Sequence, residues 1–257
     1  MTVFIPYCGT PPVPGSESWN FDPKLIAGLA LSAVLVHWRS TRTRDASHWR
    51  NVTTPAGMVV LALAFVSPLC NLSVALFSAR AAQHMLLTLV AAPLIASGLV
   101  RAGASLDGWV RARSALAATL LFAGVFWIWH TPAAYDETLR NNLVYWLMHV
   151  STIGAALVLW LVVYKSSGLV AFLVVSATGL QMSLLGAVLT FAGRPLYSVH
   201  ASTTSAWGLT WLQDQQVGGL LMWVPAGLLL TLYSVFALGS MFVRMNAAGR
   251  APLESVA

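Results

Sequence analysis

Four histidines in this sequence can be placed near one level of a set of apolar helices, where they could bind a metal ion together. His84 lies about one turn inside an apolar segment, and His130 ends another in "FWIWHTP". His149 lies roughly 12 Å along a third segment at 1.5 Å per residue, and His200 belongs to a polar loop expected at the same end. Imidazole is the commonest metal ligand and binds copper well. The pattern therefore predicts a metal site formed from these histidines.

Each histidine also has a purely structural interpretation. His130 stands beside tryptophans and a proline, and could be an interfacial residue. His149 shares a helix face with Tyr145 and Thr152, so this polar stripe could hydrogen-bond to neighbouring helices. His84 could pair with a nearby carboxylate. The sequence alone leaves both kinds of interpretation open.

The two cysteines are expected at the same end of the apolar helices as these histidines. Cys8 lies in the N-terminal segment, and Cys70 lies in "SPLCNLSV" near the end of an apolar segment. They could form a disulfide, Cys70 could be inert and buried, or both could be thiolate ligands for Cu(I). Met85, Met148 and Met222 could add thioether ligands.

Further polar residues adjoin the predicted site and could position its ligands or a partner. Arg80 and His84 are four residues apart and share a helix face, so Arg80 or the adjacent Gln83 could place a partner or an anion there. Asp214 lies near a helix start, where it could cap that helix or orient a ligand histidine. The other candidates of this kind are Tyr145, Asp136, Gln215 and Met222.

The sequence carries none of the motifs of the main hydrolase and nucleotide-binding classes. Nothing resembles a phosphate-binding loop, a Ser–His–Asp set or the His-Glu-x-x-His of metalloproteases. We therefore expect a protein that binds and transfers a ligand, not an enzyme.

The composition predicts an all-α membrane protein. Hydrophobic residues make up 58% of the 257 residues and charged residues only 9%, whereas about a quarter of a soluble domain is charged. Long apolar runs predict a polytopic bundle of seven transmembrane helices. The first run is short, so six spans with that run lying in the interface are the alternative. The expected spans are 24–38, 55–76, 80–100, 113–130, 141–164, 169–192 and 216–242.

The chain is organised as one membrane domain, residues 24–242, between two short flanking segments. A Pro-rich, irregular extracytoplasmic lead, residues 1–23, precedes it, and a short cytoplasmic tail, residues 243–257, follows. The lead shows no basic region followed by an apolar core, as a cleavable signal peptide would.

The net charge of +6 is explained by membrane topology, so it indicates no nucleic-acid partner. With the N-terminus outside and the C-terminus in the cytoplasm, ten basic residues fall on the cytoplasmic side. Four fall outside, namely Lys24, Arg80, Arg140 and Arg194. This split follows the positive-inside rule and predicts that orientation.

Several stretches resemble the seven-span CtaG-like family of cytochrome c oxidase assembly factors. They are "LFSARAAQHMLLTLVAAPLI", "WIWHTPAAYDETLRNN", "GRPLY" and "DQQVGGLLMWVPAG", and the lead is similar to that of the proteobacterial branch. The resemblance extends from about residue 7 to about residue 240 and implies a multi-pass protein of the bacterial inner membrane. It implies maturation of a haem-copper oxidase through copper handling. The family's motif residues fall on His84, His130, His149, Asp214, Gln215 and Gln216.

The resulting hypothesis is a membrane scaffold with a small polar pocket below the outer surface. Surrounded by membrane lipid, it would take Cu(I) from a periplasmic donor and pass it to an oxidase subunit. A metal-free docking scaffold is one alternative, and a haem-binding protein using His84 with His149 is another. A copper transporter is disfavoured because the membrane midplane offers chiefly Thr178 and Gln181.

Overall fold

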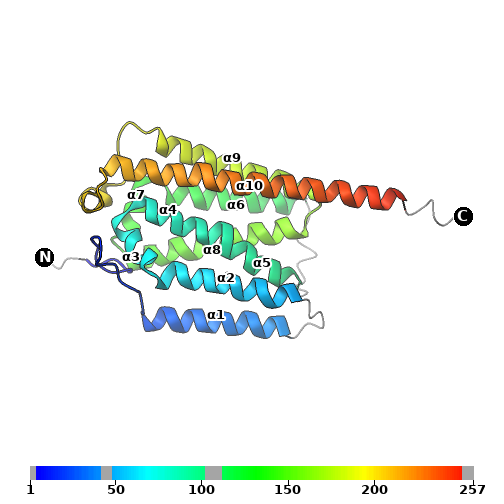
Figure 1. Cartoon of the computed structure of the whole chain (residues 1–257), viewed down its shortest axis with the longest axis horizontal. Helices are drawn as coiled ribbons and strands as arrows, with labels where there is room; N and C mark the ends of the chain where they lie inside the picture. The colour runs from blue at the N-terminus through cyan, green and yellow to red at the C-terminus, as the bar shows by residue number, and fades with distance from the viewer. Residues whose placement is uncertain (1–3, 42–47, 102–111, 251–257) are drawn as a thin grey trace, which may run out of the picture.

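The computed structural model describes residues 4–41, 48–101 and 112–250 of the chain. The regular elements in these ranges are helices, most of which run side by side along one axis (Figure 1). This confirms the predicted all-α class. The α-helices are α1 (Pro23–Thr41), α2 (His48–Val66), α3 (Pro68–Ala75), α4 (Phe77–Met85), α5 (Ala92–Arg101), α6 (Ala112–Trp129), α7 (Pro132–Thr138), α8 (Asn142–Lys165), α9 (Gly168–Thr190) and α10 (Trp211–Arg250). The other helical turns are the π-helix η1 (Leu86–Ala91) and the 3-10 turns η2 (Ser198–His200) and η3 (Thr204–Trp207).

Four helical segments are long and apolar enough to cross a membrane individually. Two bent pairs, α2 with α3 and α6 with α7, raise the number of candidate spans to as many as six, so the chain forms a polytopic membrane bundle. The predicted first span corresponds to α1, whose apolar part, Pro23–Trp38, is shorter. Helix α1 lies alongside α2 (Figure 1). It is too short to be counted among these candidates, so a total of seven spans stays a prediction. The four single candidates are Phe77–Val100, Asn142–Lys165, Gly168–Thr190 and Trp211–Val243.

A serine and a proline interrupt the predicted span 55–76. Pro68 is the first residue of α3, and the Ser67 side chain caps that helix by accepting from the Leu69 amide at 3.3 Å. Proline has no amide hydrogen and clashes with the preceding turn, so α3 is bent by 48° from α2. The predicted span 55–76 therefore corresponds to a bent helix pair, with a break that was not predicted. A second bend, of 76°, separates α6 from α7 at Thr131 and Pro132.

The third membrane segment changes its helix type after Met85, the residue that follows His84. Here α4 gives way to the π-helix η1 before α5 resumes the α-helical path. The Trp160 indole donates to the Thr88 carbonyl at 2.8 Å, and the Thr88 hydroxyl donates to the His84 carbonyl at 2.7 Å. These bonds satisfy backbone carbonyls in the irregular turn. Such π-helical turns are rare and frequently lie at functional sites.

Glycines allow α9 and α10 to pack closely. A Cβ on Gly219 would lie 2.7 Å from the Gly186 carbonyl oxygen and 2.7 Å from the Thr190 amide nitrogen. On another face of α10, a Cβ on Gly218 would lie 2.3 Å from the ring of Phe77 on α4. Small residues serve such close approach in many membrane bundles.

The described part of the lead has no helix and lies across one end of the bundle, called the lead end below (Figure 1). The Asn71 amide donates to the carbonyls of Cys8 and Thr10, at 3.0 and 2.9 Å. The Trp207 indole donates to the Pro12 carbonyl at 3.1 Å. These bonds attach the lead to α3 and to the loop before α10, so it covers that end.

Two predictions depend on residues outside the described ranges. Helix α10 continues to Arg250, past the predicted domain boundary at 242, while residues 251–257 of the predicted tail lie outside. Segments 42–47 and 102–111, whose arginines contribute to the predicted orientation, also lie outside. The orientation of the bundle therefore stays a prediction.

Candidate metal centre

Three of the four predicted histidines come together inside the bundle near the lead end. His84 lies on α4, His130 directly follows α6, and His149 lies on α8. The ring centroids of His84 and His149 are 5.2 Å apart, and those of His84 and His130 are 6.4 Å apart. All three side chains are buried. These three residues are called the histidine group below.

Backbone carbonyls orient two of these rings. Nδ1 of His130 lies 2.7 Å from the Phe126 carbonyl, and Nδ1 of His149 lies 3.0 Å from the Tyr145 carbonyl. A carbonyl only accepts, so Nδ1 donates in each case, and in a neutral ring Nε2 then carries a lone pair. Nε2 of His149 and Nε2 of His84 are buried without a hydrogen-bond partner among the described residues. Buried polar atoms are usually bonded, so these nitrogens are candidates for ligand contact.

A small cavity of about 20 Å³ lies against the histidine group. It receives side chains from α4, η1, α6, α8, α9 and α10, and it combines two imidazoles with three thioethers. Its volume is close to that of one bound water, which is the scale of a single metal ion. The lining residues are Ala81, His84, Met85, Thr88, Phe126, Trp129, His130, Thr152, Met182 and Met222.

The thioethers of the cavity only partly match the predicted ones. Met85 and Met222 line it as predicted, whereas Met148 is buried but is not among the lining residues. Met182 on α9 also lines it and was missed. Methionine in an apolar helix usually serves packing, so Met182 gave no signal of its own. Its polar neighbour Gln181 could have drawn attention to this part of the helix.

The part of the chain that the structure describes contains no group of three His, Cys, Asp or Glu side chains arranged to hold a metal ion. The histidine group is therefore in ring contact but does not form one complete ligand shell. His84 and His130 share their cavity with methionine sulfurs instead. Imidazole and thioether together suit a soft ion such as Cu(I).

His200 lies apart from the histidine group, against Tyr135. Its Nε2 is 2.8 Å from the Tyr135 hydroxyl, and the side chain is fully buried in the loop between α9 and α10. Burial lowers the pKa of His200 to about 3, and the positive charge of Arg80 acts in the same direction. This histidine therefore stays neutral at physiological pH.

Arg80 is a buried cation close to the histidine group, with only 1% of its surface exposed. One guanidinium nitrogen donates to the Thr138 hydroxyl at 2.5 Å. Its Cζ lies 5.3 Å from the centroid of the Tyr135 ring and 5.8 Å from that of Tyr145. Nε and the second terminal nitrogen have no hydrogen-bond partner among the described residues. Aromatic faces stabilise a cation, yet a buried charge ordinarily has an anionic partner as well.

Asp214 caps a helix, but a different one from the helix that the sequence suggested. Its carboxylate accepts from the Phe77 and Ser78 amides, at 2.6 and 3.1 Å, and from the Ser78 hydroxyl. It therefore holds the N-terminus of α4, the helix that carries His84, although Asp214 itself belongs to α10. A carboxylate at this end also complements the helix dipole. Neither predicted role, capping its own helix or contacting a histidine, describes this arrangement.

Three further candidates fasten neighbouring segments. The Gln83 amide nitrogen donates to the Ala64 carbonyl at 2.7 Å, while its Oε1 is buried without a partner among the described residues. The Gln215 side chain accepts from the Leu196 amide at 2.7 Å, which fixes the loop before α10. The third candidate, Asp136, accepts from Ser198 and lies 3.8 Å from Arg140.

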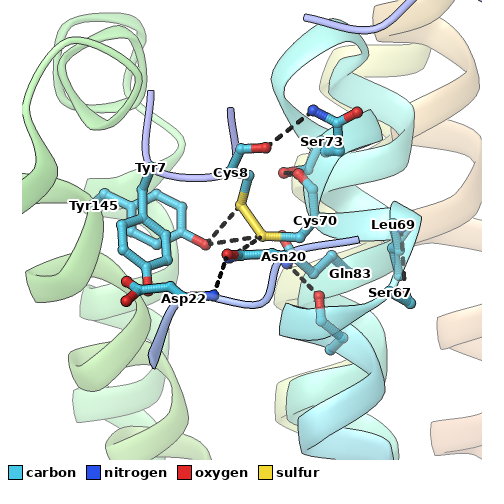
Figure 2. The surroundings of a disulfide bond; sticks show 12 residues. Tyr7, Cys8, Asn20, Asp22, Ser67, Leu69, Cys70, Ser73, Gln83 and Tyr145 are labelled. Carbon is cyan, nitrogen blue, oxygen red and sulfur yellow. Dashed lines mark hydrogen bonds between the residues drawn. A yellow bond between two sulfur atoms is a disulfide. The ribbon is translucent and has the colours of Figure 1, made fainter. Parts of the chain in front are cut away.

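Cys8 and Cys70 form a disulfide that joins the lead to α3 (Figure 2). This is one of the three states that the sequence left open, and in it neither sulfur is a thiolate. The Tyr145 hydroxyl lies 3.2 Å from the sulfur of Cys8 and 3.8 Å from that of Cys70. The Asn20 amide is 3.7 Å from the Cys70 sulfur.

Comparison with known proteins matches most of the chain to one family. The profile of a family described as cytochrome c oxidase caa3 assembly factor matches residues 32–245, a range that includes the histidine group and the cavity methionines. No curated protein and no solved structure shows significant similarity to the chain. Since the matched range covers most of the sequence, the chain belongs to the family of cytochrome c oxidase caa3 assembly factors.

Proposed function

We propose that this assembly factor holds Cu(I) in the cavity beside His84 and His130 and delivers the ion to a subunit of the caa3-type oxidase. Assembly of that oxidase follows from the family, whereas copper binding and delivery are our proposal. We also place the protein in the bacterial inner membrane with its lead end facing the periplasm, where a copper donor would meet it.

One observation carries the copper proposal. Two imidazoles and the sulfurs of Met85, Met182 and Met222 line a single cavity, and the adjacent Nε2 of His84 has no hydrogen-bond partner among the described residues. Leucine or phenylalanine would fill such space without leaving a buried polar atom unbonded. The donor types match a soft monovalent ion, because thioether sulfur and imidazole nitrogen both bind Cu(I).

Neutral ligands suit a protein that must release its metal. Thioether and imidazole donors carry no charge, so bound Cu(I) is not held by the strong attraction that several thiolates would provide. A docking oxidase subunit could then remove the ion by offering its own ligands one at a time. The chain's contribution would be to orient His130 through the Phe126 carbonyl and to keep water from the site. We expect transfer without a catalysed reaction.

The other candidate functions receive less support from the geometry. The cavity of about 20 Å³ is far smaller than a porphyrin, so the proposal does not extend to haem between His84 and His149. A metal-free docking scaffold would use the same bundle with the histidine group as packing. The two accounts differ in whether loss of a cavity ligand changes copper binding.

Copper titration of the detergent-purified protein tests the proposal. The protein with its disulfide intact should bind one Cu(I) per chain, measured anaerobically by competition with a coloured Cu(I) chelator. His84→Leu and Met182→Leu should each weaken that binding strongly. Met148→Leu is the matched control, because Met148 is buried but does not line the cavity, and it should bind copper as the unmodified protein does.

The same variants should be examined in cells in copper-poor medium. If the cavity serves copper, His84→Leu should lower oxidase activity at a normal protein level, and added copper should restore part of it by mass action. Full oxidase activity with His84→Leu and Met182→Leu, together with no Cu(I) bound by the unmodified protein in vitro, would favour the metal-free scaffold.

A further inference from the structure

The disulfide between the lead and α3 lies beside Tyr145 (Figure 2). Cys8 and Cys70 are 4% and 0% exposed, and both sulfurs lie near the Tyr145 hydroxyl. The Tyr145 ring packs on the His149 ring at a centroid distance of 4.3 Å. His149 in turn contacts His84, which lines the cavity. Side-chain contacts are therefore continuous from the two sulfurs to the proposed copper site.

The same tyrosine also contacts the buried cation. The Arg80 guanidinium lies over the Tyr145 ring, and two of its nitrogens have no hydrogen-bond partner among the described residues. The disulfide, close to the hydroxyl of that ring, is electrically neutral. Taking a charge out of water without pairing it is unfavourable, so this corner of the bundle favours an additional negative charge.

Reduction of the disulfide would supply that charge together with soft metal ligands. The Cα atoms of Cys8 and Cys70 are 5.4 Å apart, so both thiolates could contact one ion between them. Cu(I) prefers thiolate sulfur, and one Cu(I) with two thiolates carries a net charge of −1. That complex would lie at the hydroxyl of Tyr145, whose ring has the Arg80 guanidinium 5.8 Å from its centroid, and opposite charges attract strongly in buried surroundings.

We propose that Cys8 and Cys70, once reduced, form a second Cu(I) site at the lead end, with Arg80 as its buried counter-charge. An extracytoplasmic dithiol protein would supply two electrons and two protons to the disulfide and would itself become a disulfide. Cu(I) would then displace the two thiol protons without changing its own oxidation state. The disulfide form keeps this second site closed, while the cavity beside His84 binds copper in both forms. The inference rests on the proposed function, since it concerns the loading of the same cargo.

Copper stoichiometry in two redox states tests this second site. The full chain in detergent is reduced with a phosphine, freed of the reductant without oxygen, and titrated with Cu(I) beside the oxidised protein. The oxidised form should bind one Cu(I) and the reduced form two. Cys8→Ser and Cys70→Ser should each bind one in either state. Arg80→Gln, when reduced, should bind the second ion about tenfold more weakly, the order of effect of one charge acting across an aromatic ring.

The outcomes separate this inference from the proposed function. A reduced protein that binds no more copper than the oxidised one would overturn the second site. A reduced protein that loses the first ion and unfolds would also overturn it, because the disulfide would then serve only to stabilise the fold. The Cys8→Ser/Cys70→Ser double variant shows the stability of the chain without the bond. If the oxidised protein binds none and the reduced protein binds one, the cavity proposal fails and the cysteine site stands.

Discussion

The contact between α9 and α10 and the histidine group are both buried in the same bundle, yet their polar atoms differ in hydrogen bonding. The hydroxyls of Thr178, Thr190 and Ser234 each donate to the carbonyl four residues earlier, at 2.7 to 2.8 Å. In the histidine group, by contrast, Nε2 of His84 and Nε2 of His149 have no such partner among the described residues. The hydroxyls of α9 and α10 are satisfied by hydrogen bonds within their own helices. In the histidine group, two imidazole nitrogens remain able to bind a ligand.

This difference separates packing from binding. A buried polar atom without a partner destabilises the fold by about 1–3 kcal/mol, and we interpret the two imidazole nitrogens as atoms kept for binding a ligand. Close approach of backbones is what the α9–α10 contact supplies. The histidine group supplies nitrogen donors. Four changes test this distinction.

The largest effect is expected at the α9–α10 contact. Gly219→Ala would place a methyl group 2.7 Å from backbone atoms on α9 that cannot move without separating the helices. We expect a loss of about 3 kcal/mol or more in the free energy of unfolding, measured by thermal denaturation in detergent. Gly154→Ala is the matched control, because its Cβ meets nothing within 4 Å. Equal melting of the two variants would contradict the close packing.

The next effect concerns the link between the two regions. Asp214→Ala removes the acceptor that bonds the Phe77 and Ser78 amides at the start of α4. Losing hydrogen bonds to a charged group should lower stability by about 2 kcal/mol. Because α4 carries His84, copper affinity should fall as well. Glu137→Ala, which removes an exposed carboxylate on α7, should leave both properties unchanged, and an unaffected Asp214→Ala protein would refute the capping role.

A smaller effect, dependent on pH, is expected at His200. Its pKa lies at about 3 in the fold because of burial and the Arg80 charge, against about 6.5 in an unfolded chain. The unfolded state therefore binds more protons between these values, and stability falls as pH drops below about 6.5 until it levels off near 3. At pH 5 the loss relative to pH 7.5 should be about 2 kcal/mol. His200→Gln should remove that part of the pH dependence, and an unchanged pH profile would contradict the burial of a neutral histidine.

The smallest effect on stability is expected inside the histidine group. His84→Leu replaces a ring that has an unpartnered nitrogen with an apolar side chain, so stability should stay within about 1 kcal/mol and rise if it changes. Copper binding should nevertheless weaken strongly. If melting instead shows a loss of several kcal/mol, His84 serves the structure in the way that the threonines of α9 do.

The fold was largely predictable because hydropathy and helix-breaking residues are local signals. Predicted limits such as 141–164 and 169–192 agree closely with α8 and α9. The break at Pro68 was missed, since a proline within a long apolar run does not reveal whether the helix bends or ends.

The site was predictable in its histidines but not in its full composition. Their positions along the expected spans placed His84, His130 and His149 near one depth, and they do meet. Spacing along one helix says nothing about which methionine on another helix faces them, so Met182 was missed. For the same reason Asp214 was assigned to its own helix, whereas the partner it bonds lies more than a hundred residues away in the sequence.

The most direct test of the account is X-ray absorption at the copper edge, on protein with its disulfide intact and loaded with one Cu(I). With both cysteines oxidised, neither sulfur is a thiolate, and the sulfurs that line the cavity are the thioethers of Met85, Met182 and Met222. The account predicts a first shell of mixed nitrogen and sulfur, with the sulfur contribution reduced in Met182→Leu and the nitrogen contribution reduced in His84→Leu. A shell of nitrogen and oxygen alone that neither substitution changes would contradict it.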